Sequence, residues 1–249
     1  MSERVLVDTR DGIATLTLNR PDKLNALDQE LCKELIDALR TVVASDTVRV
    51  VIITGAGRAF CAGADLGVLE RHGPELVAAG RDVALLIRSA PQPVIAAVNG
   101  VAVGGGANLA LACDYRLVAD TASLGQVFHK LGLAPDWGGT YFLPRLVGAS
   151  RALELIWSAR VVPAAEALAC GMIDRVVPAD RLLAEARTLA ATWADFPALA
   201  VRRAKEAIHL SERATLAEML SFEIAVQNEL FVTPEARERL DAQLATRSR

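Results

Sequence analysis

The sequence predicts an α/β fold with parallel strands in its first part, followed by a C-terminal helical module. Two observations support this prediction. Short apolar runs alternate with segments of helical periodicity as far as about residue 180, and beyond it nearly every signal is helical. The 249 residues are 52% hydrophobic and 23% charged, which is enough apolar surface to form a sizeable core. We therefore expect a core over residues 1–190 and a helical module over residues 191–249.

The first predicted elements are a hairpin and a helix. Two apolar runs, Val5–Val7 and Ile13–Leu18, are separated by a turn that contains Asp11-Gly12, and Asp-Gly is a strong hairpin signal. A helix is expected from about Asp28 to Val43, because apolar residues recur there at helical spacing.

The rest of the core alternates between predicted strands and helices. Compact apolar runs are typical of buried parallel strands, and they lie at residues 48–54, 94–98 and 115–119. Helices are expected near residues 74–89 and 105–113. In the C-terminal module, Pro197 and Pro234 mark breaks between successive helices.

Composition and charge exclude several classes of function. A net charge of −3 gives no support for a nucleic-acid surface. No apolar run is long enough to span a bilayer, and the first residues lack the apolar centre of a signal peptide. The four cysteines are scattered, without a histidine at metal-ligand spacing. We expect a cytoplasmic protein that binds no nucleic acid, membrane or metal.

Three Gly-rich turns are the candidates for ligand binding, at residues 55–65, 99–108 and 132–140. Glycine lets backbone N–H groups approach a ligand, and N–H groups at a helix N-terminus attract negative charge. The triple glycine at 104–106 is not followed by the Lys-Ser/Thr of a P-loop, and no dinucleotide fingerprint is present. The alternative is that these turns are tight connections with no ligand.

Four blocks resemble those of one enzyme family: residues 19–27 (NRPDKLNAL), 60–66 (FCAGADL), 99–106 (NGVAVGGG) and 170–177 (CGMIDRVV). The chain is similar along essentially its whole length to the crotonase family, the enoyl-CoA hydratase/isomerase superfamily. The resemblance implies a crotonase-like spiral of ββα units that carries a CoA site. It also implies a C-terminal module for assembly as a homotrimer or dimer of trimers. The implied partner is an acyl-CoA thioester substrate, with no cofactor beyond the CoA that this substrate carries.

The resemblance also assigns roles to individual residues. It implies an oxyanion hole made by the backbone N–H groups of Ala64 and Gly105, which would hold the thioester oxygen as it gains negative charge. It places CoA along a set of residues from three segments of the chain: Lys23, Leu24, Ala26, Arg58, Ala62 and Lys205. For Lys23 and Arg58 the alternative is a solvated surface cation. Lys205 matches a family lysine that can reach the CoA of its own or of a neighbouring subunit.

The type of reaction depends on the acid–base residues. Family hydratases use two glutamates, and the corresponding positions here are Asn108 and Phe128, neither of which can transfer a proton. Asp136 is present instead. The stretches 106–114 and 126–136 most resemble the phenylacetate-pathway isomerases, which act on epoxyphenylacetyl-CoA and shift double bonds in enoyl-CoA. The alternative for Asp136 is a turn former or helix N-cap.

The hypothesis from the sequence is an acyl-CoA isomerase. Asp136 would take a proton beside the thioester or at the allylic position and return it at another carbon, while the oxyanion hole holds the dienolate. An apolar wall including Phe128 and Trp137 would raise the pKa of Asp136. Asn108 would orient the substrate or a hydrogen bond, or would only pack. The alternatives are an enoyl-CoA hydratase with a rearranged carboxylate and a non-catalytic acyl-CoA-binding paralogue.

Overall fold

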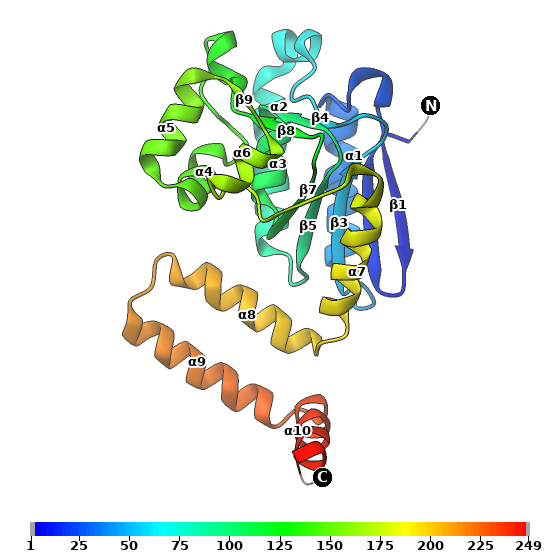
Figure 1. Cartoon of the computed structure of the whole chain (residues 1–249), viewed down its shortest axis with the longest axis vertical. Helices are drawn as coiled ribbons and strands as arrows, with labels where there is room; N and C mark the ends of the chain where they lie inside the picture. The colour runs from blue at the N-terminus through cyan, green and yellow to red at the C-terminus, as the bar shows by residue number, and fades with distance from the viewer. Residues whose placement is uncertain (1–2, 248–249) are drawn as a thin grey trace.

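The computed structural model describes residues 3–247, which form a two-sheet core and an arm of three helices (Figure 1). The large sheet has the strand order β1-β2-β3-β5-β7-β10, and the small sheet has the order β4-β6-β8-β9. The strands of the large sheet are β1 (Val5–Arg10), β2 (Ile13–Leu18), β3 (Val50–Gly55), β5 (Val94–Val98), β7 (Tyr115–Ala119) and β10 (Arg175–Val177). Those of the small sheet are β4 (Ala59–Cys61), β6 (Val101–Val103), β8 (Ser123–Gly125) and β9 (Val161–Pro163).

Successive strands along the chain belong alternately to the large sheet and to the small sheet between β3 and β8. The successive strand pairs β3/β4, β5/β6 and β7/β8 each contribute the first strand to the large sheet and the second strand to the small sheet. Helix α2 (Leu66–Ser89) follows the first pair, and helix α3 (Gly105–Ala112) follows the second. This repeat is the implied spiral of ββα units, and the predicted α/β fold with parallel strands is confirmed.

The predicted apolar runs form the centre of the large sheet. Val50–Ile53 of β3 and the whole of β5 are buried. Helix α7 (Leu182–Ala194) packs against four strands of this sheet, and α1 (Gln29–Val43) packs against β1, β2 and α2. When both faces of a strand are covered, its sequence is a continuous apolar run rather than an alternating pattern.

The starts of the first two long helices are set by aspartate caps. The side chain of Asp28 accepts a hydrogen bond from the first turn of α1 at 2.8 Å, and that of Asp65 accepts one from the first turn of α2 at 3.2 Å. Helix α2 therefore begins eight residues before the predicted position 74. It bends at His72, whose backbone angles are not helical, and Pro74 follows where the start of a new helical segment tolerates proline.

The sequence-based prediction does not include the small sheet. Strands β4 and β6 lie inside the first two Gly-rich turns, and each is only three residues long. Such short strands are stabilised by pairing with each other and with β8. Their own residues are therefore too few to predict a strand. The remaining short helices are η1 (Pro21–Lys23), η2 (Val127–Leu131), α4 (Gly139–Val147), α5 (Ala149–Ser158), α6 (Ala164–Ala169) and η3 (Ala179–Arg181).

The arm consists of α8 (Ala198–Ser211), α9 (Leu216–Phe231) and α10 (Pro234–Arg247). The breaks at Pro197 and Pro234 are confirmed. The predicted boundary after residue 190 falls inside α7, which packs on the large sheet, so the arm begins after Pro197 (Figure 1). Within residues 3–247, no helix is both long and apolar enough to cross a membrane.

Candidate active site

A loop between β2 and α1 lies against the turn that leads into α2. The Ala62 N–H donates to the Leu24 carbonyl at 2.9 Å, and the Leu27 N–H donates to the Gly63 carbonyl at 2.7 Å. The buried Asn25 side chain donates to two carbonyls of the 56–59 turn. These bonds bring the segment 23–27 beside residues 58–64, so five of the predicted CoA-binding residues and Ala64 lie on one connected surface.

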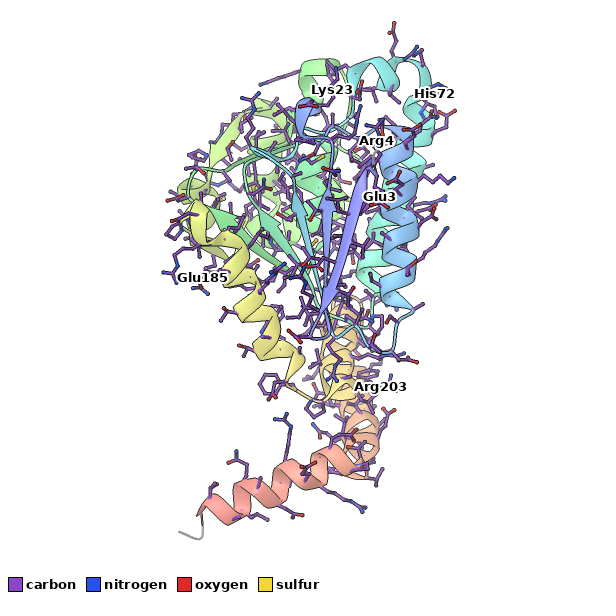
Figure 2. The ribbon with its side chains drawn as sticks, turned by 90° about the vertical axis from the view of Figure 1, so that its right-hand side faces the viewer. Glu3, Arg4, Lys23, His72, Glu185 and Arg203 are labelled. Atoms are coloured by element: carbon purple, nitrogen blue, oxygen red, sulfur yellow. The ribbon has the colours of Figure 1, made fainter. Side chains whose placement is uncertain are left out.

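Lys23 and Arg58 are exposed on this surface, and Figure 2 shows Lys23 at the end of the core opposite the arm. A Cβ atom at Gly57 would lie 3.0 Å from Pro21, which places the turn of Arg58 next to the helix that contains Lys23. Neither cation is among the hydrogen bonds or ion pairs formed within the described part of the chain. Both charges are therefore available for an anionic ligand such as a phosphate.

The first two Gly-rich turns are in direct contact. A Cβ atom at Gly63 would lie 2.8 Å from the Val103 carbonyl oxygen, and one at Gly106 would lie 2.2 Å from the Cys61 carbonyl oxygen. Only glycine lets the two backbones approach this closely. The contact brings the segment that contains Ala64 against the N-terminus of α3, where Gly105 is the first residue.

The N–H groups of Ala64 and Gly105 have no hydrogen-bond partner among residues 3–247. Gly105 is buried, and it opens a helix whose first N–H groups lack an acceptor within the helix. Ala64 is half-buried. Because N–H groups removed from water are nearly always paired, two of them left open in touching turns indicate a site for a bound oxygen. This geometry fits the predicted oxyanion hole.

Asp136 lies in the third Gly-rich turn, and its carboxyl is unusual for a partly buried group. The Oδ1 atom is fully enclosed and has no hydrogen-bond partner in the described structure. Burial raises the pKa of Asp136 to about 6 from an ordinary value near 3.8. A carboxyl with this pKa can both accept and return a proton near neutral pH.

Asn108 connects the Asp136 turn to α3. Its side-chain N–H group donates to the Asp136 backbone carbonyl at 2.9 Å, and its oxygen accepts from the Gln126 side chain at 2.7 Å. Asn108 is fully buried, and a Cβ atom at Gly139 would lie within 2.4 Å of it. Both ends of the amide are therefore used within the protein, which favours a positioning role over direct contact with the substrate.

Two aromatic rings flank the glycines at the start of α3. A Cβ atom at Gly104 would lie 3.9 Å from the Phe128 ring, and one at Gly105 would lie 3.6 Å from the Trp137 indole. Both aromatic side chains are buried. The apolar wall expected from Phe128 and Trp137 is therefore present beside the candidate oxyanion hole.

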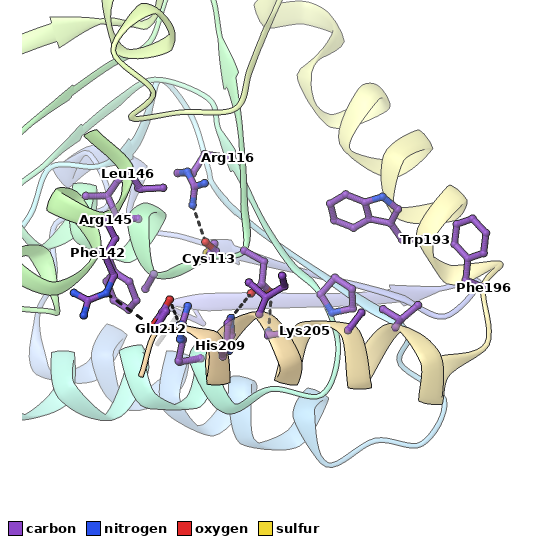
Figure 3. A pocket seen from close by; sticks show the side chains of 18 residues that line it. Cys113, Arg116, Phe142, Arg145, Leu146, Trp193, Phe196, Lys205, His209 and Glu212 are labelled. Carbon is purple, nitrogen blue, oxygen red and sulfur yellow. Dashed lines mark hydrogen bonds and ion pairs between the residues drawn. The ribbon is translucent and has the colours of Figure 1, made fainter. Parts of the chain in front are cut away.

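Lys205 lies apart from the other predicted CoA-binding residues. Its ammonium donates to Asp114 at 2.7 Å and to the carbonyls of Ile87 and Gln92 at 3.2 and 3.0 Å, and its side chain is only 9% exposed. It lies on α8, and Figure 3 shows it below Cys113, the residue that follows α3. About 12 Å of helix separates that end from Gly105. All three ammonium protons have acceptors within the chain, and contact of Lys205 with the CoA of its own or a neighbouring subunit stays a prediction.

Sequence reasoning also missed Arg20, which holds the loop of Leu24 and Ala26 in place. Its guanidinium pairs with Asp28 at 3.1 Å and with Asp65 at 3.2 Å, so it joins the caps of α1 and α2. Burial would raise the pKa of Asp65, but the hydrogen bond and charge of Arg20 lower it. The signal in the sequence is the Asn-Arg-Pro-Asp block at residues 19–22, but the block alone does not show which carboxylates its arginine pairs with.

The fold and the site together are those of one enzyme class: a ββα spiral with two open backbone N–H groups in touching turns and a partly buried carboxyl in a third turn joined to α3. The chain belongs to the enoyl-CoA hydratase/isomerase family, whose model matches residues 8–248. It is 40% identical over 258 residues to the 1,2-epoxyphenylacetyl-CoA isomerase of Escherichia coli, covering 100% of this chain and 98% of that protein. It is 36% identical over 250 residues to the crotonyl-CoA hydratase of Syntrophomonas wolfei, with coverages of 98% and 96%.

Solved structures agree with this membership. The crystal structure of an enoyl-CoA hydratase from Bacillus anthracis superposes with a TM-score of 0.94 at 38% identity, covering 98% of this chain and 96% of that one. The relatives thus include both hydratases and an isomerase. These matches establish the family, while the choice between the two reactions depends on the site.

Proposed function

We propose that this protein is an enoyl-CoA isomerase that moves a double bond from the 3- to the 2-position or acts on an epoxyphenylacetyl-CoA type of substrate. The observation that supports this most strongly is Asp136, a partly buried carboxyl with an enclosed, unpartnered oxygen and a pKa of about 6. The positions of the two hydratase glutamates hold Asn108 and Phe128. Asn108 is occupied by structural hydrogen bonds, and a phenyl ring transfers no proton.

In the proposed mechanism, CoA lies along Lys23, Leu24, Ala26, Arg58 and Ala62, and the thioester oxygen accepts from the Ala64 and Gly105 N–H groups. Ionised Asp136 removes a proton from C2 of a 3-enoyl-CoA. The electron pair of the broken C–H bond delocalises into the thioester, and the two N–H groups stabilise the resulting dienolate. Protonated Asp136 then returns the same proton to C4, which gives the 2-enoyl-CoA. The reaction is balanced and needs no cofactor beyond the CoA of the substrate.

One carboxyl is sufficient for this reaction, because the proton that is taken is given back. Reversible hydration needs a second group that activates water. The sequence provides Asp136 alone among the family acid–base positions discussed above, which favours isomerisation over hydration.

The test is to incubate the wild type and Asp136→Asn with a 3-enoyl-CoA and a 2-enoyl-CoA, and to identify the products by chromatography. We expect double-bond migration by the wild type and a loss of about 10²- to 10⁴-fold in the variant, the usual contribution of a general acid–base group. Water addition that survives the substitution would instead indicate a hydratase. Binding without turnover of any acyl-CoA would indicate a non-catalytic paralogue.

We also propose that the arm mediates assembly of several copies, as a homotrimer or dimer of trimers. Large apolar side chains are exposed along α9 and α10: Leu216, Leu220, Ile224, Phe231, Leu240 and Leu244. Exposed apolar patches of this kind mark interaction surfaces. Light scattering on the purified chain should give a trimeric or hexameric mass, and a monomer at micromolar concentration would contradict the proposal.

A further inference from the structure

The residue after Asp136 has an unfavourable backbone conformation. Trp137 has φ = +48°, in the left-handed region that bulky residues rarely adopt, and Gly138 continues the turn with φ = +81°. A tryptophan keeps such a conformation only when its surroundings fix it. The strain is located between the candidate base and the start of α4.

The Trp137 indole is fixed on two sides. Its Nε1–H donates to the Leu76 carbonyl of α2 at 3.2 Å, and the ring is only 4% exposed. It lies so close to Gly80 of α2 that a Cβ atom there would be 2.1 Å from the ring. Its other side lies beside Gly105, the first residue of α3. The indole thus lies between the helix that covers the site and the candidate oxyanion hole.

The Asp136 turn has a second anchor in its backbone. The Asp136 carbonyl accepts from Asn108 at 2.9 Å and from the Gly139 N–H at 2.8 Å. These bonds fix the peptide but do not involve the carboxyl, whose Oδ1 atom has no partner and which is otherwise hydrogen-bonded to the Asp136 backbone itself. The enclosure of Oδ1 therefore depends on the residues packed around the turn.

We propose that Trp137 is a positioning residue: its indole, packed against Gly80 and Gly105, fixes the left-handed turn that keeps the Oδ1 atom of the Asp136 carboxyl enclosed and unpartnered. This inference rests on the proposed function of Asp136. A shift of the indole releases the turn and allows the carboxyl to reach water, which stabilises its ionised form. A solvated carboxylate is a weaker base and has a pKa close to that of an ordinary aspartate.

The test changes α2 rather than the catalytic turn. Gly80→Ala places a methyl group where the indole lies. Gly73→Ala is the control at the bend of α2, because its Cβ atom would meet only the Leu69 side chain at an ordinary 3.7 Å. Both substitutions add the same methyl group, but only the one at Gly80 meets the indole. For each we would measure kcat and KM for a 3-enoyl-CoA, the pH dependence of kcat/KM, and the Kd for a saturated acyl-CoA.

We expect Gly80→Ala to lower kcat at least tenfold, with the KM and the Kd changed less than twofold. The inflection in kcat/KM should move from about pH 6 towards about pH 4, while Gly73→Ala should behave like the wild type. A Gly80→Ala variant that keeps the wild-type kcat and inflection would overturn the proposal. If Gly80→Ala does not fold, Trp137→Phe provides the test, because it removes the hydrogen bond to Leu76. A Trp137→Phe variant with an unchanged inflection and kcat would overturn the proposal. A wild type that shifts no double bond would instead refute the proposed function itself.

Discussion

Two aspartates at opposite ends of α3 have opposite surroundings. Asp114, just beyond the C-terminal end of α3, accepts from Lys205 at 2.7 Å and from the Val94 N–H at 2.8 Å, and His209 lies 3.6 Å away. Figure 3 shows Lys205 and His209 on α8 with dashed lines to their partners. Asp136, whose backbone is bound near the other end of α3, has an enclosed carboxyl oxygen with no partner.

Burial alone does not decide what these two carboxyls do. Burial would raise the pKa of Asp114, but the nearby His209 side chain and the charge and hydrogen bond of Lys205 outweigh it and lower the pKa. At Asp136 no cation compensates, and burial raises the pKa to about 6. A paired carboxyl remains ionised and holds α8 on the core, whereas an unpaired one can exchange a proton with a ligand.

The largest expected effect comes from breaking the Asp114 pair. Lys205→Met removes the cation and leaves an ionised carboxylate enclosed without its main partner. Such a loss destabilises a protein by about 3–5 kcal/mol, and urea unfolding followed by circular dichroism would measure it. The double variant Lys205→Met with Asp114→Asn should recover much of the stability, because no buried charge is left. A single variant as stable as the wild type would show that the pair is not structural.

Some elements of the fold could be predicted from the sequence and others could not. The buried strands β3, β5 and β7 could be predicted because each is a continuous apolar run. The small sheet could not, because its three-residue strands depend on pairing between distant segments. Asp136 and the candidate oxyanion residues came from the resemblance to a family, and no propensity or spacing identifies an open N–H group.

The ion pair of Lys205 could not be predicted from the sequence for a similar physical reason. A lysine in an amphipathic helix looks the same in the sequence whether its ammonium is solvated or buried. Asp114, the partner that decides the matter, is 91 residues away in the chain. The bonds from Gln126 through Asn108 to the Asp136 carbonyl were hidden for the same reason, since they join three separate turns.

The pH dependence of the reaction tests the unpaired side of the comparison. Asp136 must be ionised to remove a proton, and its pKa is about 6. We therefore expect kcat/KM to be nearly constant above pH 7 and to fall about tenfold for each unit well below pH 6, which corresponds to about 1.4 kcal/mol per tenfold change. Stopped assays of the wild type between pH 5 and 8 would measure this. An inflection near pH 4 would mean that the carboxyl is solvated, like an ordinary aspartate.

The smallest expected effect concerns stability at the same residue. The folded-state pKa of Asp136 lies above the value near 3.8 of an ordinary aspartate, so folding favours the protonated form. Its stabilising contribution is fully present below about pH 4 and is lost as the pH rises through 6. Asp136→Asn resembles the protonated form at every pH, and it should therefore be more stable than the wild type at pH 8 by about 1 kcal/mol, a value reduced for partial exposure to solvent. Urea unfolding at pH 4 and pH 8 would measure both differences. The gain should vanish at pH 4, and a gain of equal size at both values would show that the ionised Asp136 carboxylate is not disfavoured in the folded protein.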